Sequence, residues 1–267
     1  MANILSKIIA NRKKQINQLK LESTIADFEK IISAKNIIIP SFYNALSADG
    51  VNIIAEVKRA SPSKGIISEN FDYIKIAHQY EKGGAAAISV LTEPTFFQGD
   101  ISYLKQISSE VALPVLCKDF VIELIQIYQA RAIGGSAILL IADVLSKHQL
   151  REFIRHAHDV GLSCLVEVHN ERQAYMALES GGRAIGVNNR NLETFEVDLA
   201  VSERLRTLIP GDRIFISESG IHTREDMERL ERIGVNGVLI GESLMRARNI
   251  ADKLAELRGV TGGNDED

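Results

Sequence analysis

One short pattern recurs four times along the chain, and it constrains the possible fold more than any other feature. Each copy has a polar helix end, a glycine, a step of small residues and an apolar run, as in EKGGAAAISVL at 81–91 and AIGGSAILLIA at 132–142. The other copies are ESGGRAIGVNN at 179–189 and RIGVNGVLIGE at 232–242. Glycine ends a helix in a left-handed conformation at little cost, and a wholly apolar run is typical of a parallel strand covered on both faces. The repetition therefore predicts parallel βα units.

Eight strands are predicted in all, with amphipathic segments between them. The strands are expected near 51–58, 85–91, 114–118, 136–141, 162–168, 183–188, 213–217 and 236–240. Helices are expected between them, over segments such as Phe71–Lys82, Glu123–Ala132, Lys147–Val160 and Arg224–Ile233. Eight such units close a barrel, and a chain of 267 residues has the usual length for one. We therefore predict a single (β/α)8 TIM barrel of the α/β class.

The two ends of the chain lie outside this repeat. Residues 1–47 are expected to be a helical extension packed on the barrel, with helices over Ile4–Leu21 and Ser23–Ala34. Ser23 is the predicted N-cap of the second helix. The barrel itself is expected over 48–258, and the polar, acidic residues of 259–267 are expected to be disordered. The whole chain is thus predicted to form one domain.

Composition narrows the class of protein. The net charge is -4 and no long basic run is present, so nucleic acid is not an expected partner. No segment has the roughly 18 apolar residues of a spanning helix, and Met1–Lys20 lacks the apolar stretch of a signal peptide. Cys117 and Cys164 lie in apolar runs and are expected to be buried thiols. These features predict a cytoplasmic protein without a membrane partner, and they are compatible with a monomer.

Charged and polar residues interrupt five of the predicted strands near their C-terminal ends. They are Glu56 and Lys58, Lys118, Glu167, Asn188 and Arg190, and Glu218 and Ser219. In a barrel that end holds the active site, and burying one charge is costly unless it is paired. A salt-bridge network that merely closes the barrel is the alternative. Five converging strands favour a functional site, in which lysines and glutamates shift each other's pKa values as acid–base chemistry requires.

Two glycines follow predicted strands seven and eight. Gly220 lies in ISESGI at 216–221, and Gly241 in LIGESLM at 239–245, before a short helical stretch. Thr223 and Asp226 resemble a capping box. Barrels commonly bind phosphate in these two loops through backbone amides and a helix N-terminus. The alternative is that each glycine only forms a turn, but their position at adjacent strand ends favours a phosphate site.

The motifs together resemble those of the indole-3-glycerol phosphate synthase family of tryptophan biosynthesis. The matching segments are AEVKRASPSKG at 55–65, LTEPTFFQGD at 91–100, PVLCKDF at 114–120, ILLIA at 138–142, LVEVHN at 165–170, IGVNNRNL at 185–192, SESGI at 217–221 and LIGESLMR at 239–246. They follow the family's order over about residues 51–250, and the first and sixth are highly specific. The resemblance implies that 1-(2-carboxyphenylamino)-1-deoxyribulose 5-phosphate is the substrate, and that its indole ring is closed with loss of CO₂ and water. It implies no metal or cofactor, and no G-x-G-x-x-G, Walker or Cys/His metal motif is present.

The resemblance also implies catalytic roles for the charged residues. Lys118 would be the acid at the ribulose carbonyl, and Glu167 the base of the dehydration. Lys58 would be a second acid or a phosphate contact. Glu56 would keep the lysines charged or bind substrate hydroxyls, and Glu218 is a further catalytic candidate.

Substrate contacts follow from the same resemblance. Asn188, counted with the catalytic residues, and Arg190 would orient the anthranilate part, Arg190 being suited to its carboxylate. An apolar slot for the ring would consist of Phe97, Phe120, Leu139 and Leu192, with plain core packing of the aromatic residues as the alternative. The residues expected to bind or cover phosphate are Ser61, Ser63, Ser219, Gly220, Gly241 and Glu242, besides Lys58. The loop Arg59–Ile66 is a candidate lid over the site.

Two other functions remain compatible with such a barrel. One is a different phosphosugar enzyme, similar to phosphoribosylanthranilate isomerase, whose proton shift uses a Cys or Asp pair where this chain has Lys and Glu. The other is a non-catalytic phosphate-binding barrel, which would be expected to have lost Lys118 or Glu167.

Overall fold

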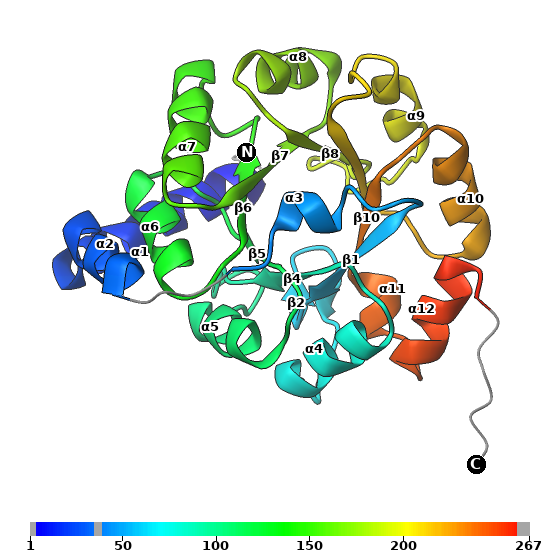
Figure 1. Ribbon diagram of the computed structural model, residues 1–267, viewed down its shortest axis with the longest axis horizontal. Coiled ribbons are helices and arrows are strands. Elements are labelled where there is room, and N and C mark those ends of the chain that lie inside the picture. The colour runs from blue at the N-terminus through cyan, green and yellow to red at the C-terminus, as the bar shows by residue number, and fades with distance from the viewer. Residues whose placement is uncertain (1–3, 35–38, 261–267) are drawn as a thin grey trace.

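The computed structural model describes residues 4–34 and 39–260, and at its centre lies a closed barrel of eight parallel strands (Figure 1). In chain order these strands are β1 (Asn52–Val57), β4 (Ala87–Leu91), β5 (Val115–Lys118), β6 (Ala137–Ile141), β7 (Ser163–Val168), β8 (Ala184–Asn188), β9 (Ile214–Glu218) and β10 (Gly237–Ile240). Each pairs with the next, and β10 closes the barrel on β1 with Gly237 opposite Asn52. The predicted (β/α)8 fold is confirmed.

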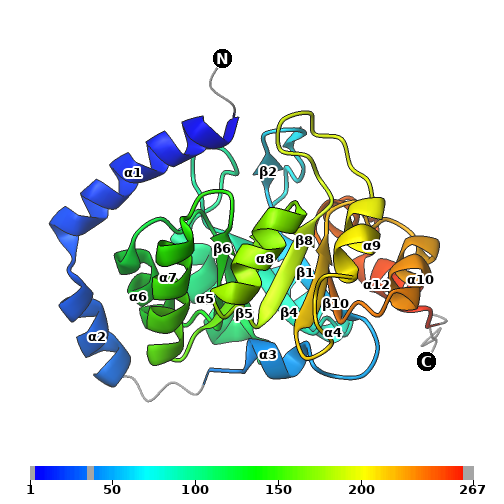
Figure 2. The ribbon, with the colours of Figure 1, turned by 90° about the horizontal axis from the view of Figure 1, so that it is seen from above.

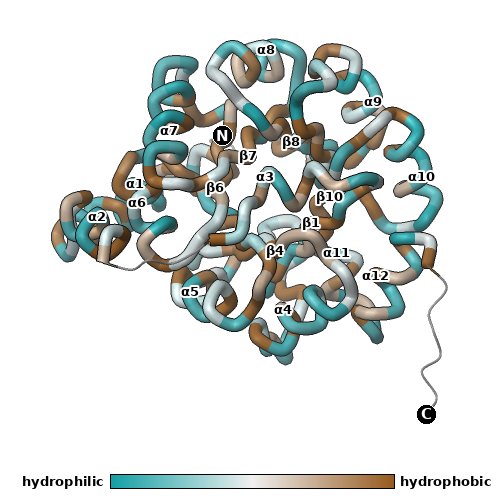
Figure 3. Tube along the Cα trace, in the orientation of Figure 1, coloured by the Kyte–Doolittle hydropathy of each residue, from teal (hydrophilic) through white to brown (hydrophobic). Residues whose placement is uncertain are grey.

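Helices surround the barrel between successive strands, with apolar strands at the centre and many hydrophilic residues on the ring (Figure 3). They are α4 (Tyr73–Lys82), α5 (Ile101–Glu110), α6 (Leu124–Ala132), α7 (Lys147–Asp159), α8 (Glu171–Glu179), α9 (Ala200–Arg206) and α10 (Arg224–Arg232). The short α11 (Glu242–Met245) and α12 (Ile250–Arg258) follow the last strand. The four helices predicted by residue range agree with α4, α6, α7 and α10 to within two residues, and α10 begins with the predicted Thr223–Asp226 capping box.

The recurring glycines end the helices as expected. Gly84, Gly134, Gly181 and Gly234 follow directly on the helix C-caps and have φ values of 79°, 103°, 91° and 72°. A side chain is strained in this left-handed region, and glycine is not. The repeat is thus a turn that joins each helix to the next strand.

Alternate strand residues form two separate cores. Inward-pointing residues such as Ile54, Leu116 and Leu165 fill the barrel, and its N-terminal end is closed by α3 (Phe42–Ala45) with the buried side chain of Phe42. Outward-pointing residues pack beneath the helices. Cys117 and Cys164 belong to this outer layer and are buried and free, as predicted.

Of the helices that precede the barrel, α1 (Ile4–Glu22) and α2 (Ile25–Ala34) lie along its outside (Figure 2). α1 begins beside the end of the barrel that carries the hairpin of β2 (Ala60–Ser61) and β3 (Gly65–Ile66), and α3 lies at the opposite end. α2 packs against α6. None of the helices in 4–34 and 39–260 is long and apolar enough to cross a membrane.

The predicted N-cap of α2 is wrong by one residue. Thr24 occupies this position: its Oγ1 accepts a hydrogen bond from Asp27 N at 3.3 Å, and Asp27 Oδ2 accepts one from Thr24 N at 3.0 Å. This reciprocal pair needs an acceptor three residues after the cap. Ser23 is followed at that spacing by Ala26, which has none. At the other end of the chain, residues 261–267 of the predicted disordered tail lie outside the described residues.

Candidate active site

A cavity opens at the carboxyl ends of the barrel strands, and every residue singled out in the sequence lines it. Those residues are Glu56, Lys58, Ser61, Ser63, Phe97, Lys118, Phe120, Leu139, Glu167, Asn188, Arg190, Leu192, Glu218, Ser219, Gly220, Gly241 and Glu242. The alternation of strand side chains explains the convergence, because residues two apart along a strand point to the same side. In β5, for example, the side chains of Leu116 and Lys118 both point into the barrel.

The ammonium group of Lys118 lies among three carboxylates from three other strands. Its Nζ is 3.7 Å from Glu167 Oε2, 3.7 Å from Glu218 Oε2 and 4.0 Å from Glu56 Oε2. Burial by itself lowers the pKa of Lys118, but the three carboxylates outweigh it and raise the pKa above its ordinary value. Lys118 is therefore charged at neutral pH and can donate a proton to a substrate oxygen.

Glu56 joins the two lysines of the site. Its Oε1 lies 2.6 Å from Lys58 Nζ, and its other oxygen faces Lys118. Burial alone would raise the pKa of Glu56, but the two ammonium groups hold it below its ordinary value. Glu56 is thus an ionised residue that fixes both cations in place.

Glu218 has the opposite electrostatic behaviour. Its side chain is almost wholly buried, and burial, followed by the negative charge of Glu167, raises its pKa to about 8 against the opposing effect of Lys118. Its Oε1 has no hydrogen-bond partner among the described residues. At neutral pH the site therefore holds a protonated carboxyl group, Glu218, and an ionised one, Glu56, as acid–base chemistry needs.

The protonation of Glu218 predicts a pH dependence of stability. Between about pH 4.5 and about pH 8 the folded state keeps a proton that the unfolded state has lost, so the free energy of unfolding should fall as pH rises through this window. Glu218→Gln should remove this contribution, because an amide does not titrate. Urea denaturation at pH 5 to 9 measures the difference, with the exposed Glu69→Gln as control. Equal slopes for Glu218→Gln and the unchanged chain would show that Glu218 ionises normally.

A glycine in β8 makes room for the Glu218 side chain. A Cβ at Gly186 would overlap with Glu218 Oε1 and lie 3.0 Å from Leu165 Cδ1. The side chain at this inward position would have to displace a buried carboxyl group. We expect Gly186→Ala to lower the free energy of unfolding by about 1–3 kcal/mol, the usual cost of overpacking a core. Urea denaturation tests this, with Gly211→Ala as the control, because a Cβ at Gly211 meets nothing within 4 Å. Equal destabilisation of both variants would contradict the packing argument.

Glu167 is oriented by the neighbouring strand. Asn188 Nδ2 donates to Glu167 Oε1 at 3.3 Å, and Asn188 Oδ1 accepts from the backbone N–H of Arg190 at 3.0 Å. The Arg190 guanidinium donates to the carbonyl of Phe195 at 3.2 Å, and it makes no other side-chain hydrogen bond with the described residues. Its remaining donors are available to an anion in the cavity.

One wall of the cavity is apolar. The rings of Phe97 and Phe120 lie 6.0 Å apart, and Leu139 and Leu192 line the same cavity. The structure adds Ile4, Leu5 and Ile8 of α1, which the sequence reasoning did not find. The sequence does indicate that Ile4 and Ile8, which are four residues apart, lie on one apolar face of a helix. It does not show which surface that face covers.

The loops after β9 and β10 present backbone groups to the cavity. Ser219 has a left-handed φ of 68°, and Asn189 Nδ2 holds its carbonyl at 3.0 Å. Such strain in a non-glycine residue is typical of functional loops. No hydrogen bond within 4–34 and 39–260 uses the backbone N–H of Gly220 or Gly241. Both amides are therefore available to an anion.

The side chain and the backbone of Glu242 suit different contacts. Its Oε1 lies 3.6 Å from Lys64 Nζ and 3.3 Å from Arg246 Nε, so the carboxylate is paired with cations at the rim. A carboxylate repels phosphate, and only the backbone N–H of Glu242, at the start of α11, suits the predicted contact.

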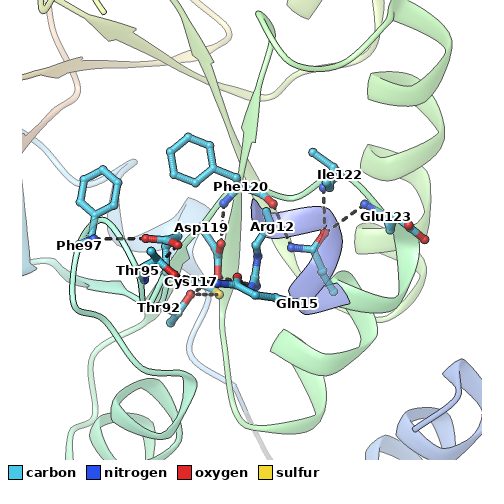
Figure 4. A network of polar contacts seen from close by, with 12 residues as sticks. Arg12, Gln15, Thr92, Thr95, Phe97, Cys117, Asp119, Phe120, Ile122 and Glu123 are labelled. Carbon is cyan, nitrogen blue, oxygen red and sulfur yellow. Dashed lines mark hydrogen bonds and ion pairs between the residues drawn. The ribbon is translucent and has the colours of Figure 1, made fainter. Parts of the chain in front are cut away.

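A polar network that the sequence reasoning missed attaches α1 to Asp119, the residue that follows Lys118 in the chain (Figure 4). Arg12 Nη2 lies 2.8 Å from Asp119 Oδ2, and Thr92 Oγ1 donates to the same oxygen. Asp119 follows Lys118 but points to the outer layer, where a buried carboxylate needs a cationic partner. This requirement indicates that Asp119 has a cationic partner, but it does not identify Arg12 as that partner.

The described residues contain no group of three or more His, Cys, Asp or Glu side chains arranged to hold a metal ion.

Comparison with known proteins places the chain. The family model "Indole-3-glycerol phosphate synthase" matches residues 5–257. The chain belongs to this family. A relative of that name from Endomicrobium trichonymphae is 53% identical over 257 residues, which cover 96% of this chain and 99% of the relative. Another from Acetivibrio thermocellus is 51% identical over 259 residues, covering 96% and 100%. The family membership predicted from the motifs is confirmed, and the match includes α1 and α2.

Solved structures support the fold. The chain superposes on 3-hexulose-6-phosphate synthase from Salmonella typhimurium with a TM-score of 0.65 at 11% identity, covering 78% of this chain and 97% of that one. A mutant tryptophan synthase α-subunit from Pyrococcus furiosus gives 0.60 at 16% identity, covering 78% and 98%. At these identities the likeness concerns the barrel alone.

Proposed function

We propose that the chain converts 1-(2-carboxyphenylamino)-1-deoxyribulose 5-phosphate into indole-3-glycerol phosphate, CO₂ and water, as a carboxy-lyase of tryptophan biosynthesis. One observation carries the proposal: in a chain of this family, the charged ammonium of Lys118 lies within 4.0 Å of three carboxylates at the mouth of the barrel. The reaction needs an acid, a base and an anion site around one small molecule, and the cavity offers all three.

Ring closure begins at the ribulose carbonyl. Lys118 donates a proton to the carbonyl oxygen, so that the carbonyl carbon becomes electrophilic. The aromatic carbon that carries the carboxylate forms the new bond, and CO₂ then leaves while its bonding electrons restore the aromatic ring. The wall of Phe97, Phe120, Leu139 and Leu192 favours this loss, because an apolar slot stabilises a neutral product better than a carboxylate.

Dehydration requires two groups that act together. Glu167 takes a proton from the carbon next to the hydroxyl-bearing one, and Lys58 protonates the hydroxyl group as it leaves as water. Glu56 supports both steps, because it holds Lys58 at 2.6 Å and contributes to the charged state of Lys118. Asn188 keeps Glu167 in position through its hydrogen bond to Oε1.

The two anionic ends of the substrate need separate contacts. The free amides of Gly220 and Gly241, with the hydroxyls of Ser61, Ser63 and Ser219, suit the phosphate. Arg190 suits the anthranilate carboxylate, since a guanidinium binds a carboxylate through two parallel hydrogen bonds.

An assay of the purified protein with the anthranilate substrate tests the function. Formation of indole-3-glycerol phosphate is followed by its fluorescence, and the expected result is turnover without added metal or cofactor. Isomerisation of phosphoribosylanthranilate instead would support the other phosphosugar chemistry. Binding without turnover of either compound would identify a non-catalytic phosphate-binding barrel and overturn the proposal.

A further inference from the structure

His169 lies behind Glu167, on the side away from Lys118. It follows the end of β7, two residues after Glu167, and its Nε2 lies 3.5 Å from Glu167 Oε1. Lys118 contacts the other oxygen, Oε2, at 3.7 Å. His169 does not line the cavity, so it is not positioned to touch the substrate. Glu167 therefore separates an imidazole on one side from the reaction space on the other.

The two nitrogens of the His169 ring have different surroundings. Nε2 is shut off from solvent and has no hydrogen-bond partner among the described residues. Nδ1 also makes no hydrogen bond with the described residues, but unlike Nε2 it is not shut off from solvent. The side chain as a whole is 16% exposed. The ring thus connects the solvent at Nδ1 to the carboxylate at Nε2. An imidazole with this arrangement can pass a proton through its two nitrogens.

The proposed reaction needs such a proton in every turnover. The substrate enters with a carboxylate and loses it as neutral CO₂, so the negative charge stays behind and must be neutralised. Two protons are donated, one to the carbonyl oxygen and one to the leaving hydroxyl, and only one is recovered when Glu167 deprotonates carbon. One proton per turnover must therefore come from solvent, while the side chains of the two lysines and of Glu167 are largely buried.

We propose that His169 relays this proton from solvent to Glu167, an inference that rests on the proposed function. Solvent protonates Nδ1, and the proton on Nε2 moves to Glu167 Oε1. Through Oε2 the carboxyl group then delivers two protons to Lys118 in turn: the one taken from carbon, which continues through Glu56 to Lys58, and the one from His169, which stays on Lys118. Both lysines, which have each given a proton to the substrate, are thereby recharged. The relay is reset when the ring swings so that Nε2 reaches solvent and takes up a proton there while Nδ1 releases one.

The surroundings of His169 hold it in place for this role. Its backbone N–H donates to Gln173 Oε1 at 2.8 Å, and Gln173 Nε2 donates to Asp143 Oδ1 at 2.7 Å. The charged group that faces its ring is Glu167, whose Oε1 also accepts from Asn188. The main chain of His169 is therefore fixed, and its ring lies against the Glu167 carboxylate.

Three variants separate a relay from a purely structural role. In dilute buffer, His169→Ala should lower kcat by at least about tenfold, less than the loss of a direct acid or base. Added imidazole should restore much of this activity, because it can enter the space left by the side chain. His169→Gln, which can donate a hydrogen bond to Glu167 but cannot carry a proton, should stay slow and show a larger solvent deuterium isotope effect on kcat. His148→Gln, on the exposed face of α7, is the matched control and should behave like the unchanged chain.

Each outcome decides the relay independently of the proposed function. An unchanged chain that makes no indole-3-glycerol phosphate overturns the function itself. If the unchanged chain is active and His169→Ala is equally fast, the relay is wrong. Recovery of activity in His169→Gln, or failure of imidazole to accelerate His169→Ala, would show that the residue only positions Glu167, and would also overturn the relay.

Discussion

Replacing Lys118 by methionine should lower kcat by at least about a hundredfold, the usual scale of a lost acid–base group. Methionine occupies a similar volume, so the change removes the proton donor without opening a large hole at the mouth. The three carboxylates around Nζ would then lose their shared cation, and Glu56 would keep its second lysine partner, Lys58. The fluorescence assay measures kcat and KM of the purified variant.

The fold should survive this replacement, because Glu218 can take up a proton instead of remaining as an unpaired charge. Glu218 already has a pKa of about 8, and removal of the ammonium beside it should raise that pKa further. The loss of stability should accordingly grow as pH rises. Lys147→Met is the matched control, because Lys147 pairs with Glu179 on the exposed surface of the ring. Near-normal turnover of Lys118→Met would remove Lys118 from the chemistry.

The barrel was predictable from the sequence because its signals are local. The wholly apolar run AILLI at 137–141 and the glycine before it describe a buried strand and the turn that leads into it. Four copies of the pattern were enough to place the strands, because the same physical requirement acts at every helix-to-strand junction. The position of the site followed from the same argument, since charges at the ends of buried strands can only converge at the mouth.

The contacts between elements were not predictable in this way. Arg12 and Asp119 are far apart in the chain, and nothing in the spacing of either residue indicates that α1 attaches next to Lys118. The N-cap of α2 shows the same limit on a smaller scale, since Ser23 and Thr24 are both good capping residues. The choice depended on Asp27, which can pair with only one of them.

The protonation states also required the structure. Glu56, Glu167 and Glu218 occupy equivalent places in three strands, yet the pKa of Glu56 is lowered and that of Glu218 is raised. The difference arises because Glu56 contacts two ammonium groups, whereas Glu218 shares one with its carboxylate neighbours. A sequence shows that charges meet, but the sign of each shift depends on which atoms face each other.

Replacing Glu167 by glutamine should reduce kcat as severely as the loss of Lys118, by about a hundredfold or more, with little change in KM. Glutamine has nearly the same shape and keeps an oxygen that can accept the hydrogen bond from Asn188, so the site should retain its geometry. It cannot accept a proton from carbon, and dehydration would lose its base. An increase in KM with kcat unchanged would instead identify Glu167 as a binding residue.

The double variant provides a sharper test of whether the two residues act together. If Lys118 and Glu167 work through one shared proton network, Lys118→Met/Glu167→Gln should be about as slow as the slower single variant, and the two losses should not multiply. Their separation of 3.7 Å is close enough for such coupling. The control is Glu203→Gln, which breaks a surface pair with Arg229. Adding Glu203→Gln to Lys118→Met should leave the kcat of Lys118→Met nearly unchanged. Fully multiplicative losses for Lys118 and Glu167 would mean that the two residues contribute independently to the same rate-limiting step, which is incompatible with a proton network that needs both.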